Sequence, residues 1–152
     1  MNLRKTISKE AIVLELKSTT KPAVLEELVD LLVAVARIPD RKAVLRAILD
    51  REKKMSTGMM NGVAVPHAKT DLVEGLVAVI GLKKEGLDFD SLDGQPVRII
   101  VMTLSPLKRP GPHVQLLAEI SRILEDENKR QRILNATTRE EVLDLLTNGN
   151  EN

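Results

Sequence analysis

The chain has 152 residues, of which 43% are apolar and 30% are charged, and its net charge is +1. This length and balance fit one domain, predicted over residues 1–152 with an ordered core from about residue 7 to residue 146. The near-zero charge and the single aromatic side chain offer neither an electrostatic field nor a stacking platform for nucleic acid. The absence of cysteine excludes disulfides, thiolate catalysis and zinc sites built on cysteine.

The sequence shows no targeting or cofactor motif. The first ten residues lack the apolar stretch of a signal peptide, and no apolar run reaches membrane-spanning length. We therefore expect a soluble, cytoplasmic protein without direct membrane insertion, and the lack of cysteine fits that compartment. No metal-binding His-Glu-x-x-His and no Walker-type phosphate loop occurs, so we expect no metal and no cofactor. No Gly-x-Ser-x-Gly elbow supports a Ser-His-Asp triad.

The first third of the chain alternates a strand with two helices. Residues 11–16 are apolar and partly β-branched, which predicts a strand. A helix is predicted to follow the caps at residues 18–20 and to end before Pro39. Asp40 is expected to cap the next helix, whose core-facing residues are Val44, Leu45, Ile48 and Leu49.

Three further strands are predicted in the middle of the chain, over residues 63–65, 76–82 and 97–102. The last of them is the most apolar and is expected to be the most buried. Residues 86–94 read as turn material around Phe89. The lysines near these segments are expected to be solvated charges; they are Lys53, Lys54, Lys83 and Lys84.

The last third is predicted to be helical, over residues 112–124, 127–134 and 139–146. Thr138 is the expected cap of the final helix, with Glu141 at the capping-box position. The tail over residues 148–152 is expected to fray. Strands interleaved with helices predict an α/β fold: a single layered domain whose mixed β-sheet is flanked by helices on both faces.

His67 is one of only two histidines and ends the segment Asn61-Gly-Val-Ala-Val-Pro-His67-Ala-Lys69. This position, after a glycine-containing loop and a short strand, suits a side chain that must be exposed and oriented. Imidazole is a competent nucleophile near neutral pH if a partner orients its other nitrogen, and carbonyl groups near Pro66 or Lys69 are candidates. The alternative is a structural histidine at a strand end.

His113 lies on the apolar face of its predicted helix, with Leu116, Leu117 and Ile120. That periodicity favours a core histidine. His113 is also in the first helical turn, where backbone N–H groups favour anions and disfavour imidazolium. A neutral imidazole there would donate one hydrogen bond to a bound phosphate.

Arg51 falls at the end of a predicted helix, where a solvated cation is favourable. Its guanidinium would alternatively grip phosphate oxygens through two parallel hydrogen bonds. The nearby loop from Ser56 to Gly62 is only a weak match to a phosphate cradle. Within it, Met59 and Met60 read either as a pliable docking surface or as ordinary loop packing.

These motifs together resemble a known family. The run from Arg51-Glu through Ser56-Thr-Gly to His67-Ala-Lys69, with His113-Val-Gln-Leu-Leu-Ala further on, is similar to type 2 enzyme IIA domains. These fructose, mannitol and nitrogen-regulatory proteins belong to the phosphoenolpyruvate-dependent sugar phosphotransferase system (PTS). The resemblance covers the chain from about residue 7 to residue 146. One departure is Met60, where the family commonly has glycine.

The resemblance implies a phosphocarrier. His67 would accept a phosphoryl group from phospho-HPr and pass it to a IIB domain, with Arg51 and His113 completing the site. Nitrogen-regulatory members often have glycine after the active histidine, and the Ala68 found here favours the sugar-transporting branch. The alternatives are a regulatory enzyme IIA that binds a regulatory target protein, and a binding module whose histidines are structural.

Overall fold

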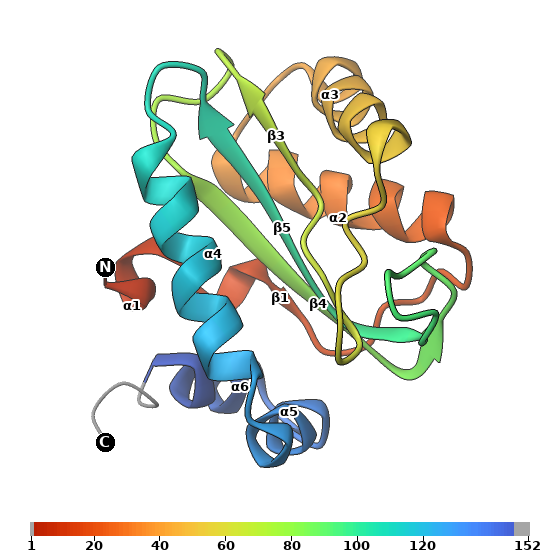
Figure 1. Cartoon of the computed structure of the whole chain (residues 1–152). Coiled ribbons are helices and arrows are strands. Elements are labelled where there is room, and N and C mark those ends of the chain that lie inside the picture. The colour runs from red at the N-terminus through yellow and green to blue at the C-terminus, as the bar shows by residue number, and fades with distance from the viewer. Residues whose placement is uncertain (1, 148–152) are drawn as a thin grey trace.

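The computed structural model describes residues 2–147, so the predicted fraying of residues 148–152 lies outside the described part. Its centre is a five-stranded mixed sheet with helices on both faces, as the sequence predicts (Figure 1). The strands are β1 (Ile12–Val13), β2 (Val63–Ala64), β3 (His67–Thr70), β4 (Val77–Leu87) and β5 (Val97–Pro106).

The sheet has the order β1-β4-β5-β2, and β3 also pairs with β5. Only β4 and β5 are antiparallel; β1 is parallel to β4, while β2 and β3 are parallel to β5. Ala64 is in register with Ile100 and His67 with Thr103, so β2 and β3 continue one line along β5. Pro66 interrupts that line because it has no N–H to donate, although its carbonyl accepts from Thr103 N–H at 3.0 Å. His67 therefore begins a new strand segment directly beside Thr103.

Helices pack on the two faces of this sheet. The bounds are α1 (Leu3–Thr6), α2 (Lys21–Ala36), α3 (Arg41–Lys54), α4 (Gly111–Leu124), α5 (Glu127–Leu134) and α6 (Arg139–Thr147), with a 3-10 turn η1 over Lys9–Ala11. Helices α2 and α3 cover one face, and α4 crosses the other (Figure 1). Burial of β5 reflects this layering, because every residue from Ile99 to Ser105 is buried.

The predicted helix caps are confirmed. The Thr20 hydroxyl accepts from Ala23 N–H, and the Asp40 carboxylate accepts from Ala43 N–H. The Thr138 hydroxyl accepts from Glu141 N–H at 3.1 Å, while the Glu141 carboxylate reaches back to Thr137 N–H. These signals are local in sequence, which is why they can be read without the fold.

Strand lengths differ from the prediction. The strand expected over residues 11–16 is reduced to β1, because only two residues pair with β4 at the sheet edge. Strand β4 runs beyond the expected end at residue 82, through a register shift to Leu87. Gly86 within it has φ +78°, a left-handed conformation that favours glycine. Phe89, expected in a turn, is completely buried.

The expectation that Lys83 is solvated is wrong. Its side chain is 5% exposed, because β4 continues through this position under the chain that follows β1. The ammonium donates to the Leu16 carbonyl at 3.0 Å and pairs with Glu85 at 3.0 Å, which satisfies the buried charge. Lys53, Lys54 and Lys84 are exposed, as predicted.

Helix α1 was not predicted. Within residues 2–147, the helices are too short or too polar for any of them to cross a bilayer.

Candidate functional site

His67 is half-buried at the start of β3, and the main chain orients its ring. Nδ1 lies 2.7 Å from the carbonyl oxygen of Val65. Because a carbonyl can only accept, Nδ1 carries the proton and donates it. In the neutral ring the lone pair then resides on Nε2. The orienting carbonyl is that of Val65, beside the Pro66 position considered from the sequence.

His113 comes from α4 and lies beside His67. The two rings have centroids 4.9 Å apart and planes inclined by 43°. His113 is the third residue of α4 and is only 7% exposed. Its Nδ1 lies 3.1 Å from the hydroxyl of Thr103, the β5 residue in register with His67. His113 therefore packs with the core, as its periodicity predicts, and it lies beside His67; its role toward a phosphate stays a prediction.

The surroundings of Thr103 decide which nitrogen of His113 carries the proton. Thr103 is fully buried, and among residues 2–147 its hydroxyl bonds to His113 Nδ1 alone. If the imidazole donated, the hydroxyl proton would have no acceptor, at a cost of about 1–3 kcal/mol. The hydroxyl therefore donates to Nδ1, and His113 carries its proton on Nε2. The two histidines hold opposite tautomers: His67 has a free Nε2 lone pair, and His113 has an Nε2–H donor.

Burial keeps His113 neutral. Desolvation, and then the charges of His67 and Lys69, lower the pKa of His113 to about 4, compared with 6.5 for an ordinary histidine. The N-terminus of α4 acts in the same direction, since Pro110 provides no side-chain cap for the first-turn N–H groups. Near neutral pH, His113 is therefore a hydrogen-bond donor without a positive charge.

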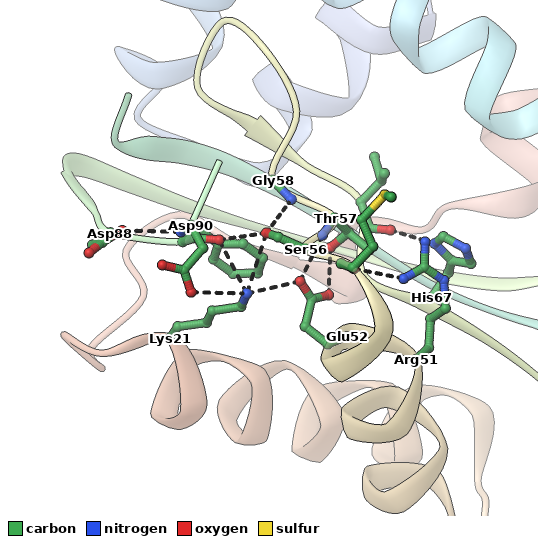
Figure 2. A network of polar contacts seen from close by, with 12 residues as sticks. Lys21, Arg51, Glu52, Ser56, Thr57, Gly58, His67, Asp88 and Asp90 are labelled. Atoms are coloured by element: carbon green, nitrogen blue, oxygen red, sulfur yellow. Dashed lines mark hydrogen bonds and ion pairs between the residues drawn. The ribbon is translucent and has the colours of Figure 1, made fainter. Parts of the chain in front are cut away.

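Arg51 lies in the last turn of α3, which packs along β3. One guanidinium N–H donates to the Met55 carbonyl at 2.8 Å, so the side chain caps its own helix end. Figure 2 draws Arg51 at the end of α3 together with His67 at the start of β3. The structure thus brings His67 and His113 together, and it places Arg51 on the helix that packs along the strand of His67.

Two polar residues at the site were not singled out in the sequence, namely Thr103 and Glu52. Thr103 stands alone as a hydrogen-bonding side chain in the apolar run Ile99 to Leu104, which is the signal that could have found it. Glu52 is 8% exposed and continues the buried face of α3 after Val44 and Ile48. A carboxylate at a core position of a helix indicates a specific set of partners.

An apolar groove of about 500 Å³ adjoins the site. It lies between the loop before β2 and the outer side of α4, and Met59, Met60, Val65 and Leu117 are among the residues that line it. Met59 is 44% exposed and Met60 is 61% exposed, so both side chains are accessible at the groove. Docking by these flexible thioether side chains stays a prediction.

Known sequences resemble this chain along most of its length. It is 39% identical over 137 residues to the PTS fructose-specific EIIA component of Haloferax volcanii, covering 90% of this chain and 89% of that protein. It is 32% identical over 133 residues to a nitrogen regulatory protein of Bradyrhizobium diazoefficiens, covering 88% and 86%. A fructose-specific EIIABC component of Bacillus subtilis is 34% identical over 146 residues; the match covers 96% of this chain but 23% of that longer protein.

Solved structures agree with the sequence comparisons. Nitrogen regulatory protein IIA-Ntr from Neisseria meningitidis superposes with a TM-score of 0.89 at 28% identity, covering 95% of this chain and 99% of that one. Enzyme IIA mannitol of Escherichia coli, solved in complex with phosphorylated enzyme IIB mannitol, has a TM-score of 0.80 at 27% identity and coverages of 93% and 97%. The model of the EIIA 2 family of the phosphoenolpyruvate-dependent sugar phosphotransferase system matches residues 5–149, and the chain belongs to that family.

Proposed function

We propose that this chain is a phosphocarrier that accepts a phosphoryl group from phospho-HPr on His67 and passes it to a IIB domain of the fructose or mannitol type. The observation that carries the proposal is the pair of adjacent histidines, whose hydrogen bonds to the Val65 carbonyl and the Thr103 hydroxyl assign them opposite tautomers. One ring presents a lone pair that can attack phosphorus, and the other presents an N–H that can bind a phosphoryl oxygen.

The proposed transfer is a direct displacement at phosphorus. His67 Nε2 supplies the electron pair of the new N–P bond, while the N–P bond to the donor histidine breaks and returns its pair to that ring. No proton has to leave His67 before attack, because Nε2 carries none. As the bond forms, positive charge develops in the ring, and the Val65 carbonyl on Nδ1–H stabilises it.

Negative charge on the three equatorial oxygens of the transferred group needs preorganised donors. Arg51 offers the guanidinium N–H groups not used by Met55. His113 offers Nε2–H, and the uncapped first turn of α4 adds partial positive charge. Phosphoryl transfer depends mainly on positioning and on charge stabilisation, and these groups supply both without a metal ion or cofactor.

The proposed partners would dock on the apolar surface around the site. Met55, Met60 and Val114 are each more than 60% exposed, at 63%, 61% and 63%. Met55 is the residue capped by Arg51, Met60 lines the groove, and Val114 follows His113. A small apolar patch with adaptable side chains suits brief encounters with more than one partner. A cytoplasmic location stays a prediction of the sequence.

The test is incubation of the purified chain with phosphoenolpyruvate, enzyme I and HPr, followed by intact-mass measurement. We expect a mass gain of one phosphoryl group that is labile in acid and stable in alkali, as for a phosphoramidate. Subsequent addition of a IIB domain should remove the group. An unchanged mass after complete phosphorylation of HPr would contradict the proposal.

A second candidate is a nitrogen-regulatory enzyme IIA, in which the same phosphorylation changes binding to a regulatory target protein. The likeness to IIA-Ntr from Neisseria meningitidis, with its TM-score of 0.89, favours this candidate. A phosphoryl dianion beside the exposed methionines would alter partner affinity through charge and desolvation. Transfer from phosphorylated chain to IIB separates the two, since a regulator would retain its phosphoryl group.

A further inference from the structure

A largely buried ion pair lies close to the end of α3, the helix that carries Arg51. The Glu52 carboxylate pairs with the Lys21 ammonium at 3.0 Å. The same carboxylate accepts from the N–H and the hydroxyl of Thr57, each at 2.7 Å (Figure 2). Three strong donors therefore converge on one carboxylate, which holds Thr57 at both its main chain and its side chain.

Two backbone hydrogen bonds continue from Thr57 to the imidazole of His67. The Thr57 carbonyl accepts from Val65 N–H at 3.0 Å. The Val65 carbonyl in turn accepts from His67 Nδ1–H at 2.7 Å. The path from the Glu52 carboxylate to the ring thus contains only one threonine and one valine. Every link is directional, because each donor and acceptor in it is fixed by chemistry.

The burial of Glu52 indicates that its carboxylate is specifically required for the bonds to Thr57 and Lys21. The residue is 8% exposed, and Thr57 is 2% exposed. Helix α3 places Val44, Ile48 and Glu52 on one face at four-residue spacing, so an apolar side chain would suit the third position. A buried carboxylate is costly unless its charge is paired and its oxygens are bonded, and here both conditions are met.

Lys21 completes this arrangement from the first residue of α2. Its ammonium also donates to the Phe89 carbonyl at 3.2 Å and lies 4.5 Å from the centroid of the Phe89 ring. The Ser56 hydroxyl donates to the same carbonyl at 2.7 Å. The loop between α3 and β2 is therefore tied to α2 and to the segment after β4 at one point.

We propose that Glu52, neutralised by Lys21, is a positioning residue for the reaction at His67. It fixes Thr57, and through the Val65 carbonyl it holds the ring with Nε2 free. This inference rests on the proposed phosphocarrier function for its kinetic consequence, but not for its effect on the ring. Arg51 precedes Glu52 in the same helical turn and binds Met55, so neighbouring residues hold the loop at Met55 and at Thr57.

Substitution of Thr57 tests the path with a small change. Thr57→Val removes the hydroxyl bond to Glu52 and retains the side-chain shape, whereas Thr57→Ser retains the bond. Thr70→Val is the matched control, because Thr70 is 9% exposed and, among residues 2–147, its hydroxyl bonds only to the local Leu72 N–H. Glu52→Gln and the exposed Asp90→Asn, whose carboxylate lies 3.9 Å from Lys21, form a second matched pair.

The first readout is the nitrogen-15 spectrum of the His67 ring at neutral pH in the unphosphorylated protein. We expect Thr57→Val and Glu52→Gln to shift population from the Nδ1–H form toward the Nε2–H form. We expect Thr57→Ser and the two controls to match the wild type. Equal ring signals in all variants would overturn the proposal, and this result does not depend on any phosphoryl donor.

The second readout is the rate of phosphoryl transfer over a range of phospho-HPr concentrations that reaches saturation. The Thr57→Val rate constant should fall about tenfold with an unchanged KM, as expected when an orienting partner is lost. Thr57→Ser should restore it, and thermal melting should show that Thr70→Val loses similar stability without this rate loss. Equal rates for Thr57→Val and Thr70→Val would contradict the proposal. Failure of the wild type to accept phosphoryl groups would instead reject the proposed function.

Discussion

The two histidines of the site are held in contrasting ways. His67 donates to a main-chain carbonyl at the break between β2 and β3, whereas His113 accepts from the Thr103 side chain inside the core. A carbonyl accepts and never donates, so the backbone alone fixes the tautomer of His67. A hydroxyl can do both, so the tautomer of His113 depends on the burial of Thr103. The comparison teaches that one ring is oriented by the chain path and the other by packing.

The largest expected effect comes from removing the proposed nucleophile. His67→Ala should accept no phosphoryl group from phospho-HPr, because no other nitrogen at the site combines exposure with a free lone pair. Intact-mass measurement after incubation with the complete phosphorylation system checks this. Undiminished labelling of the variant would show that another residue accepts the phosphoryl group. It would also contradict the assignment of His67 as nucleophile and His113 as hydrogen-bond donor.

His113→Ala should fold, but it should transfer phosphoryl groups slowly. One lost transition-state donor costs roughly 3 kcal/mol, or about a hundredfold in rate. Rapid-quench kinetics with phospho-HPr, together with a melting curve, provide the measurement. A variant with normal transfer in both directions and reduced thermal stability alone would show that His113 is only a core residue.

Arg51→Lys keeps the positive charge but removes the planar pair of donors. We expect transfer to slow about tenfold or more, since an ammonium cannot bind Met55 and a phosphoryl oxygen in the same geometry. The measurement is the transfer rate at fixed ionic strength. If Arg51 acted only on the helix dipole, the change would stay within about 0.3–1 kcal/mol, and rate and stability would both be native.

Thr103→Val tests the side of the site that depends on packing. The substitution removes the donor to His113 Nδ1 and preserves the shape of a buried β-branched side chain. We expect the His113 proton to distribute over both nitrogens and the transfer rate to fall by less than in His113→Ala. Ring nitrogen-15 shifts measure the tautomer directly. Unchanged His113 shifts would show that α4 alone orients the ring.

Another prediction concerns the stability of the fold in acid rather than the transfer rate. The pKa of His113 is about 4 in the folded protein, below the ordinary 6.5. Between these two pH values the unfolded chain therefore binds a proton at His113 that the folded chain does not bind. Stability should therefore fall as pH drops from about 6.5 to about 4, by on the order of 3 kcal/mol from this group. His113→Gln should flatten that part of a stability–pH curve obtained by urea unfolding. A wild-type curve equally flat in this window would contradict the burial argument.

Phosphorylation of His67 should change the pKa of His113. A dianion on His67, beside a ring 4.9 Å away, favours the charged form of His113. The pKa of His113 should therefore rise in the phosphorylated chain, which NMR titration at alkaline starting pH can follow. The Thr103 hydroxyl would then have to rotate, because both nitrogens of an imidazolium donate.

Local sequence signals determined much of this protein. The caps at Thr20, Asp40 and Thr138 start their helices as predicted, because each satisfies backbone N–H groups within three residues. The apolar run of β5 identified the central strand, because a continuous run of apolar side chains indicates burial on both faces of a sheet. The motif around His67 also indicated the family, since its residues are consecutive along the chain.

The tertiary structure decided the remaining features of the site. Register between β3 and β5 places Thr103 beside His67, and no local signal sets that register. The extension of β4 buries Lys83 against the Leu16 carbonyl, although the charged residues Lys84 and Glu85 follow it. The Glu52 carboxylate meets Lys21 from a different helix, 31 positions earlier in the chain. Each of these contacts joins distant segments, so its energy depends on the packed fold rather than on the pattern of neighbouring residues.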